Sequence, residues 1–262
     1  MISEQKIKKG EWLASKKDQI ITSQLWGEYI DWLKRRKGER EWLLKQLRKY
    51  HCKKVFESAL GDGCDAIYLV KKGLDVVAND IDEFMLKKAI KNAKKEKVLL
   101  KTISLDWRFL DKEVPKNCFD AILCLGNSLA CLLKKNDQLK ALKQFYRILK
   151  GKGILIIDER NYQYMLNNSE MCVKGKFPYS GKYVYCGRNF HSRPIFITEN
   201  KIKFAIFNKR NNKKCTYSTY PFKRNELKKF IQKAGFRFIK QYSDYQSRYN
   251  PKADFYMYVC RK

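Results

Sequence analysis

Glycines and a carboxylate in the first third of the sequence have the types and spacing that bind a nucleotide. Gly61 and Gly63 follow an apolar run at residues 55–59, and a backbone without Cβ atoms lets a ligand approach closely. Asp80 ends the next apolar run, where a carboxylate can accept hydrogen bonds from both hydroxyls of a ribose. Ala66 stands where a dinucleotide-binding G-x-G-x-x-G turn has its third glycine, so a single adenosyl group fits better. A tight loop before a helix is the alternative interpretation of the glycines alone.

Two later segments add groups that suit the same ligand. Asp106 and Trp107 offer a carboxylate that can accept from an adenine amino group and an indole for apolar contact. A helix N-cap and a core tryptophan would use the same residues without a ligand. Residues 125–128, Leu-Gly-Asn-Ser, follow an apolar run, at a position that would face the reactive group of a methyl donor. Methyltransferases that act on the exocyclic amine of a base commonly have an Asn/Asp-Pro-Pro-Tyr box there, and this box is absent.

These residues end strands in the arrangement that the hydrophobic pattern predicts. Apolar runs of strand length alternate with segments of helical periodicity. The expected strands are 55–59, 74–78, 98–104, 119–125, 153–158, 236–242 and 254–259, and the expected helices are 83–95, 138–149 and 224–234. This alternation predicts an α/β fold, with a doubly wound, mostly parallel sheet of seven strands and helices on both faces.

Changes in texture along the chain divide it into four parts. Residues 1–50 carry helical periodicity and are expected to form an N-terminal cap, and residues 51–159 form the cofactor-binding, Rossmann-like core. Residues 160–222 are rich in short β-type stretches, which predict an inserted antiparallel β region or lid, with two-faced loops as the alternative. Residues 223–262 supply a helix and two strands that complete the core sheet.

The composition excludes several classes of protein. A chain of 262 residues with 44% hydrophobic residues can bury a core, and no apolar run is long enough to span a bilayer. The nine cysteines include no C-x-x-C pair and fall mostly in apolar stretches, so we expect reduced thiols and a soluble, cytoplasmic protein. With only two histidines, no metal site is predicted.

The net charge of +30 is the strongest feature of the composition. Such a charge attracts nucleic acid without sequence preference. Arginine, however, accounts for only 14 of the 57 basic residues, and the lysines are spread along the whole chain. We therefore expect weak, nonspecific binding of nucleic acid, without nucleic acid as a substrate. The alternative interpretation of this charge is a methyltransferase that acts on nucleic acid.

Three segments of the sequence resemble a known family. They are LWGEYIDWLKRRKGEREWLLKQL at 25–47, CLGNSLACL at 124–132 and DERNYQYML at 158–166. They are similar to the corresponding stretches of glycine N-methyltransferase and of the microbial glycine sarcosine methyltransferases that make betaine. ANDIDEFMLKKAIKNA at 78–93 and LDWR at 105–108 are more similar to the glycine sarcosine branch. The resemblance covers roughly residues 20 to 166. It implies a class I methyltransferase fold, S-adenosylmethionine as cofactor with S-adenosylhomocysteine as product, and an amino-acid substrate.

The resemblance also implies roles for individual residues. The residues that match cofactor contacts of the family are Trp26, Tyr29, Arg36, Ala59, Gly61, Asp80, Asp106, Trp107 and Leu125. Asn127 and Arg160 match the pair that binds the substrate carboxylate, and Tyr29 also reaches toward the donor methyl. Tyr185 and Tyr220 are candidates for further substrate contacts. Cys131 replaces a histidine that contacts the cofactor in the animal enzyme.

The implied reaction is N-methylation of glycine, sarcosine or both, towards sarcosine, dimethylglycine or betaine. Tyr29, Asn127 and Arg160 would be the catalytic residues, and the methyl group would move in line to a neutral amine. Arg160 would bind the substrate carboxylate through two parallel hydrogen bonds and so aim the amine at the methyl group. A methyltransferase for another small amine or acid, and an inactive cofactor-binding protein, are the further alternatives.

Overall fold

Two sheets, one large and one small, make up the computed structural model, which describes residues 21, 24–26, 28–176, 187–212 and 214–262. The seven-stranded sheet has the order β3-β2-β1-β4-β5-β10-β9. Its strands are β1 (Lys54–Glu57), β2 (Asp75–Asn79), β3 (Lys101–Ile103), β4 (Phe119–Cys124), β5 (Leu149–Arg160), β9 (Arg237–Ser243) and β10 (Phe255–Arg261). The strands from β1 to β5 pair in parallel, and β10 pairs antiparallel with both β5 and β9. The predicted doubly wound, mostly parallel sheet is confirmed.

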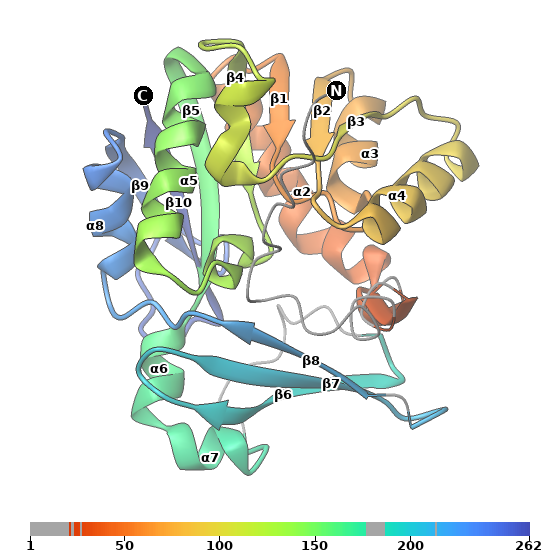
Figure 1. Cartoon of the computed structure of the whole chain (residues 1–262), viewed down its shortest axis with the longest axis vertical. Helices are drawn as coiled ribbons and strands as arrows, with labels where there is room; N and C mark the ends of the chain where they lie inside the picture. Colours follow the sequence, from red (N-terminus) through yellow and green to blue (C-terminus); the bar gives the residue numbers. More distant parts are fainter. Residues whose placement is uncertain (1–20, 22–23, 27, 177–186, 213) are drawn as a thin grey trace, which may run out of the picture.

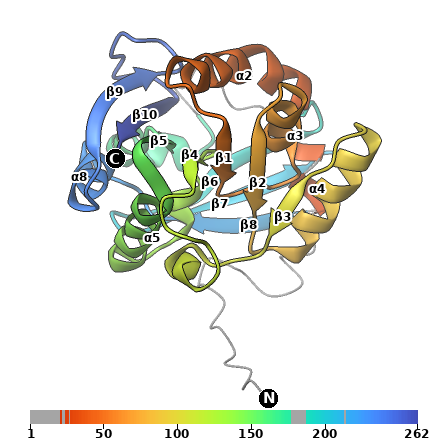
Figure 2. The ribbon, with the colours of Figure 1, turned by 90° about the horizontal axis from the view of Figure 1, so that it is seen from above.

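Helices cover both faces of this sheet. The helices are α2 (Trp32–Lys49), α3 (Cys64–Lys71), α4 (Glu83–Lys95), α5 (Lys135–Ile148), α6 (Tyr162–Asn167), α7 (Ser169–Val173) and α8 (Glu226–Lys233), with short 3-10 helices η1 (Trp107–Lys112) and η2 (Ser128–Cys131). One core cluster combines apolar residues of α5 and α8 with the sheet, and a second combines those of α2, α3 and α4 with it. Figure 2 shows the two groups of helices on opposite sides of the strands.

Three predicted elements start three or more residues away from the predicted position, and β5 begins at Leu149 where residue 153 was expected. The third strand, expected over residues 98–104, is limited to β3. Leu99, which precedes β3, is 86% exposed and so does not contribute to the core as a residue of an interior strand would. Helix α5 begins at Lys135, before the predicted start at Gln138. Its first turn is polar and carries no hydrophobic periodicity, so the sequence pattern did not reveal it.

The small sheet lies across the carboxyl ends of the parallel strands. It has the order β6-β7-β8 and is antiparallel, with β6 (Phe190–Ile197), β7 (Ile202–Asn208) and β8 (Lys214–Thr219). Figure 1 shows these strands below the ends of β1 and β2. The range 160–222, which the sequence assigned to an inserted β region or lid, therefore contains α6, α7 and this sheet.

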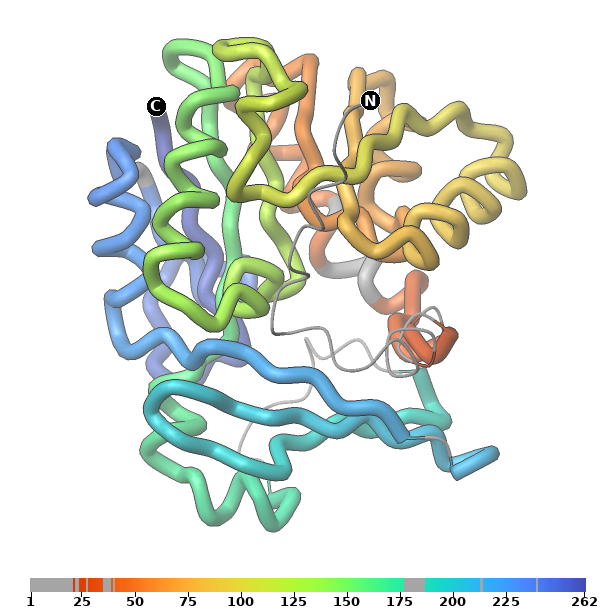
Figure 3. Tube along the Cα trace, viewed as in Figure 1, coloured from red at the N-terminus to blue at the C-terminus, as the bar shows by residue number. Residues whose placement is uncertain are grey.

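The N-terminal segment packs against the small sheet. Leu25 and Tyr29 join Phe190 and Ile206 in a separate apolar cluster. The backbone N–H of Gly187 donates to the carbonyl of Tyr29 at 2.8 Å. Figure 3 shows the segment, in red, beside the strands of the small sheet. The small sheet is thus attached to the start of the described chain as well as to α6 and α7.

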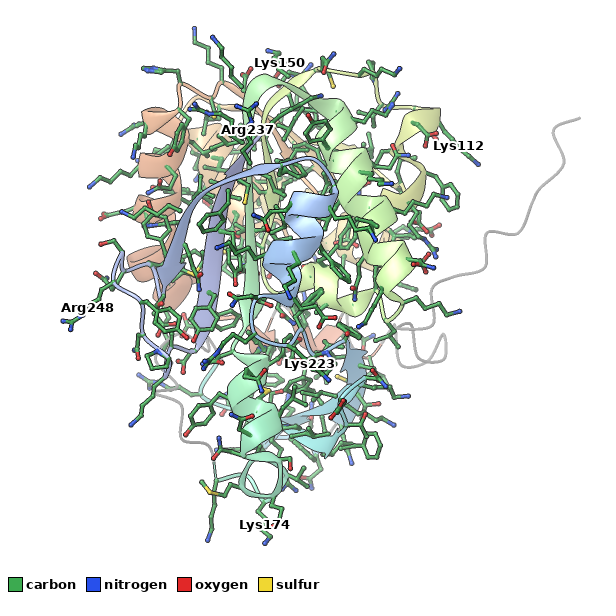
Figure 4. All side chains as sticks on the ribbon, turned by 90° about the vertical axis from the view of Figure 1, so that its left-hand side faces the viewer. Lys112, Lys150, Lys174, Lys223, Arg237 and Arg248 are labelled. Carbon is green, nitrogen blue, oxygen red and sulfur yellow. The ribbon has the colours of Figure 1, made fainter. Side chains whose placement is uncertain are left out.

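Positive charge is distributed over the whole molecule. The labelled lysines and arginines in Figure 4 extend from one end of the structure to the other, and no single element holds them. Among the described residues, no helix has the length and apolar character that crossing a bilayer requires.

Candidate active site

A cavity of about 210 Å³ opens at the carboxyl ends of β1, β2 and β4. This is the edge where parallel strands with helices on both faces bind their ligands. The residues of the predicted site that line it are Trp26, Ala59, Gly61, Asp80, Asp106, Trp107, Leu125, Asn127 and Arg160. The structure therefore brings together nine of the residues that the sequence singled out, from six separate segments of the chain.

The glycine turn after β1 brings the backbone to the cavity. Gly61 has a φ of +56° and Gly63 a φ of +88°, both in the left-handed region that favours glycine. A Cβ atom on Gly63 would lie 3.1 Å from the side chains of Ala89 and Ile67, so this glycine lets α3 approach α4 closely. A Cβ atom on Gly61 would lie 3.6 Å from the indole nitrogen of Trp26. Trp26 thus lies directly over the turn.

Asp80 is held by the backbone at the end of β2. Its Oδ2 accepts from the N–H of Gly61 at 2.8 Å, and its Oδ1 accepts from the N–H of Asp82 at 3.0 Å. Burial raises the pKa of this carboxyl to about 7, and these backbone hydrogen bonds oppose the shift. Each carboxylate oxygen has a second lone pair, so the group can accept from the two hydroxyls of a ribose.

Asp106 and Trp107 are positioned by a short network before η1. The Nε and Nη2 atoms of Arg108 donate to the carboxylate of Asp106 at 3.0 and 2.6 Å, and Nη1 donates to Asp137 at 2.9 Å. The indole N–H of Trp107 donates to the carbonyl of Ser58 at 2.6 Å, which ties the ring to the end of β1. Asp106 also caps η1, so the N-cap alternative and the ligand-binding role are compatible.

The loop after β4 is fixed by one buried carboxylate on the neighbouring strand. Asp158 accepts from the backbone N–H groups of Gly126 at 2.9 Å and Asn127 at 2.5 Å. Gly126 and Asn127 have φ values of 73° and 63°, a conformation that asparagine tolerates better than most residues. The turn therefore depends on a glycine, an asparagine and a carboxylate that lies on β5.

The side chain of Asn127 has a defined orientation. Its Nδ2 donates to the hydroxyl of Tyr162 at 2.6 Å, and its Oδ1 accepts from the backbone N–H of Arg160 at 3.1 Å. Asn127 is 4% exposed and Tyr162 is 1% exposed, so water does not compete strongly for these bonds. The amide can still donate one N–H and accept one further hydrogen bond.

Arg160 lies between two aromatic rings at the end of β5. Its guanidinium carbon is 5.0 Å from the ring centroid of Phe255 and 5.6 Å from that of Phe204. Phe255 is its cross-strand partner on β10, and Phe204 belongs to β7 of the small sheet. Both sheets therefore hold the guanidinium by cation–π contacts, and its planar fork is oriented before any ligand binds.

Four other residues of the predicted site have different positions. Tyr29 is buried, with its ring centroid 5.5 Å from that of Trp26, and it does not appear among the described residues that line the cavity. Tyr220 is also buried, and its hydroxyl donates to Glu226 at 2.9 Å. The side chain of Arg36 and the whole of Tyr185 lie outside the described residues. The roles expected for these four stay predictions.

Tyr217 lines the cavity although the sequence reasoning did not select it. It lies on β8, and its ring stacks on Phe204 with centroids 5.1 Å apart. The end of β8 separates it from Tyr220, since β8 ends at Thr219 and Tyr220 lies beyond it. Cys131 also lines the cavity, and burial raises the pKa of its thiol to about 12.

Comparisons with known proteins agree with this arrangement. A family model described as a methyltransferase domain matches residues 55–153. A solved S-adenosylmethionine-dependent methyltransferase from Clostridium acetobutylicum has a similar fold, with a TM-score of 0.71 at 16% identity over 94% of this chain and 97% of that one. The predictions of a class I methyltransferase fold and of S-adenosylmethionine as cofactor are confirmed.

Two curated relatives extend the similarity over most of the chain. The glycine/sarcosine N-methyltransferase of Aphanothece halophytica is 32% identical over 90% of this chain and 86% of its own length. The glycine/sarcosine N-methyltransferase of Parasynechococcus marenigrum is 34% identical over 90% of this chain and 81% of its own length. With the cavity, the carboxylate at the end of β2 and the paired Asn127 and Arg160 in place, the chain belongs to the glycine/sarcosine N-methyltransferase family.

Proposed function

We propose that this enzyme methylates the amines of glycine and sarcosine with S-adenosylmethionine as the donor. The curated relatives bear the name of that activity. The observation that carries the proposal is the meeting of Asn127 and Arg160 at the cavity, joined by a hydrogen bond of 3.1 Å. An amino acid differs from other small amines by its carboxylate, and these two side chains are donors suited to a carboxylate.

The residues around the cavity fit an adenosyl donor. Asp80 would bind the ribose hydroxyls, Asp106 the adenine amino group and Trp107 the face or edge of the base. The backbone of Gly61 offers close approach, and Trp26 would cover the bound nucleoside. S-adenosylmethionine supplies an electrophilic methyl group on a sulfonium, whose positive charge disperses as the methyl group is transferred.

Arg160 would select the substrate. Its guanidinium can donate two parallel hydrogen bonds to one carboxylate, with the amide of Asn127 as a third donor. The rings of Phe204 and Phe255 limit its rotation, so less conformational entropy is lost when the carboxylate binds. An amine without a carboxylate would form no such hydrogen bonds with the guanidinium, which disfavours its binding.

The substrate amine must be neutral to react. Positive charges on Arg160 and on the donor disfavour a third nearby cation and so lower the pKa of the bound ammonium group. No strong base is required under these conditions, and the proton can pass to water. Orientation of the amine is then the main contribution of the protein to the rate.

Product identification tests the proposal directly. The enzyme is incubated with S-adenosylmethionine labelled in the methyl group and, separately, with glycine, sarcosine, dimethylglycine and bulk RNA. Glycine is expected to give labelled sarcosine, and sarcosine is expected to give labelled dimethylglycine. The dimethylglycine reaction decides whether the enzyme also forms betaine. Transfer to none of the amino acids, or faster transfer to RNA, would contradict the proposal.

We also propose that the enzyme works in the cytoplasm. The eight cysteines of the described residues are free thiols, and six of them are buried. Buried thiols without disulfide partners suit a reducing compartment. A tagged protein that separates with cytoplasmic markers on fractionation would support this location, and its recovery with membranes or in the medium would oppose it.

A further inference from the structure

One residue of the small sheet reaches the cavity of the candidate active site. Among the described residues that line this cavity, Tyr217 alone belongs to the small sheet, and the others come from the large sheet, its connecting helices and loops, and the N-terminal segment. The small sheet lies across the carboxyl ends of the parallel strands (Figure 1), so Tyr217 forms the part of the wall opposite those ends. The proposed function assigns no role to this side chain.

The ring of Tyr217 is on the covered face of β8, but the ring itself is exposed to the cavity. Side chains alternate between the two faces of a strand, so Cys215, Tyr217 and Thr219 lie on one face. Cys215 is 1% exposed and Thr219 is 0% exposed, whereas Tyr217 between them is half-buried. The neighbours on both sides are therefore covered, and Tyr217 keeps its exposure at the point where the cavity meets the strand.

One aromatic residue connects Tyr217 to Arg160. Tyr217 stacks on Phe204, its cross-strand partner on β7, with ring centroids 5.1 Å apart and an angle of 12° between the planes. The same ring of Phe204 is 5.6 Å from the guanidinium carbon of Arg160. Phe204 covers one face of the tyrosine ring, which leaves the other face and the edge for the cavity. Tyr217 therefore lies at the end of the cavity where Arg160 would bind the substrate carboxylate.

The geometry of methyl transfer directs the nitrogen substituents of the substrate toward this wall. Only one carbon atom separates the amine of glycine or sarcosine from its carboxylate, so the nitrogen must lie close to Arg160 and Asn127. Its lone pair must point at the donor methyl group, which would be held at the strand ends, because the transfer is in line. The other substituents then point away from the donor, toward Tyr217. They are two hydrogen atoms in glycine, and one hydrogen atom and one methyl group in sarcosine.

We propose that the ring of Tyr217 contacts the N-methyl group of sarcosine and so raises the specificity of the enzyme for sarcosine relative to glycine. A methyl group that leaves water for an apolar surface is stabilised, and a hydrogen atom in its place is not. The carboxylate contacts of Arg160 and Asn127 are common to both substrates, so they produce no difference between them. This role rests on the proposed function, because it concerns the same site and the same reaction.

A ratio of two specificity constants tests this role. The ratio is kcat/KM for sarcosine divided by kcat/KM for glycine, measured with the full-length enzyme and S-adenosylmethionine. Tyr217→Thr removes the ring but keeps a residue that favours strands, and it should lower the ratio roughly tenfold. Tyr217→Phe keeps the ring and should leave the ratio close to that of the wild type. A displaced Arg160 would weaken both substrates alike, so the ratio separates a contact with the methyl group from mere support of Arg160.

Phe196→Ala is the matched control. Phe196 is an aromatic residue of the same sheet, is 50% exposed and is absent from the described residues that line the cavity. Its replacement should leave the ratio unchanged.

Calorimetry adds a measurement that needs neither turnover nor a substitution. The wild-type enzyme is saturated with sinefungin, an unreactive analogue of S-adenosylmethionine in which an amine occupies the place of the transferable methyl group. Sarcosine should bind to this complex more tightly than glycine, and the difference should disappear in Tyr217→Thr. Glycine bound as tightly as sarcosine by the wild type would overturn the role of Tyr217, even if Tyr217→Thr did not fold.

The kinetic outcomes separate this role from the proposed reaction. Equal losses for glycine and sarcosine in Tyr217→Thr, or an unchanged ratio, would overturn the contact with the methyl group and leave the reaction standing. A ratio that fell as far in Tyr217→Phe as in Tyr217→Thr would assign the effect to the hydroxyl and overturn the role of the ring. If the wild-type enzyme transferred no methyl group to either amino acid, the proposed reaction itself would fail.

Discussion

The side-chain oxygen of Asn127 accepts a hydrogen bond from the backbone N–H of Arg160 at 3.1 Å. The bond joins the loop after β4 to the end of β5, so the two donors of the candidate substrate site have a fixed relative position. Asp158, two residues before Arg160, reinforces the same connection by accepting from the backbone of Asn127. A substrate carboxylate that reaches these side chains meets donors that are already oriented.

Replacement of Arg160 by lysine tests the role of the planar fork. Arg160→Lys keeps the charge but loses the two parallel hydrogen bonds, so kcat/KM for glycine and sarcosine should fall roughly 100-fold or more. S-adenosylmethionine should still bind, which calorimetry can measure. Arg237→Lys, at an exposed position on β9, is the matched control and should keep full activity. Near wild-type turnover in Arg160→Lys would place the substrate carboxylate elsewhere.

Cofactor affinity should depend on pH through Asp80. Its pKa in the free protein is raised to about 7, so at lower pH the carboxyl is protonated and one acceptor is lost. Affinity for S-adenosylhomocysteine should therefore rise as the pH increases from about 5.5 to 8, and then level off. In Asp80→Asn, affinity should fall by a few kcal/mol at most and lose this pH dependence. Asp75→Asn, on the exposed end of β2, should retain the dependence, and an unchanged profile in Asp80→Asn would exclude Asp80 from the effect.

Loss of the Tyr162 hydroxyl should disturb the substrate site without disturbing the cofactor site. Tyr162→Phe removes the acceptor for Nδ2 of Asn127, which frees the amide to rotate. We expect KM for glycine to rise by about tenfold or less, which corresponds to one hydrogen bond, with cofactor affinity unchanged. Tyr146→Phe, in a half-buried ring packed on Phe236, provides a control for the loss of a hydroxyl. Equal losses of substrate and cofactor binding in Tyr162→Phe would indicate a structural role only.

Nucleic acid should bind weakly and without becoming methylated. The charge of +30 comes mainly from lysines, which are spread along the whole sequence, and the basic residues labelled in Figure 4 lie far apart. Gel-shift titrations with RNA should therefore show binding that declines steeply between about 50 and 200 mM salt. Label from the methyl donor should stay out of the RNA, and its incorporation at a rate comparable with that for glycine would reverse this ranking.

The residues at strand ends could be predicted because their position follows from the fold class. Asp80 and Asp106 end apolar runs, and any doubly wound sheet brings such ends to one edge. Tyr217 could not be selected over Tyr220 in the same way, because the bounds of β8 decide which tyrosine faces the cavity.

The order of strands in the large sheet affects how the chain folds while it is being synthesised. Arg160 of β5 pairs with Phe255 of β10, so the strand that covers this edge of β5 leaves the ribosome long after β5 itself. During that interval the nascent chain exposes an apolar strand with unpaired backbone groups, and such an edge promotes aggregation. The enzyme should therefore depend on chaperones while it is translated, and a stalled ribosome would release an insoluble fragment.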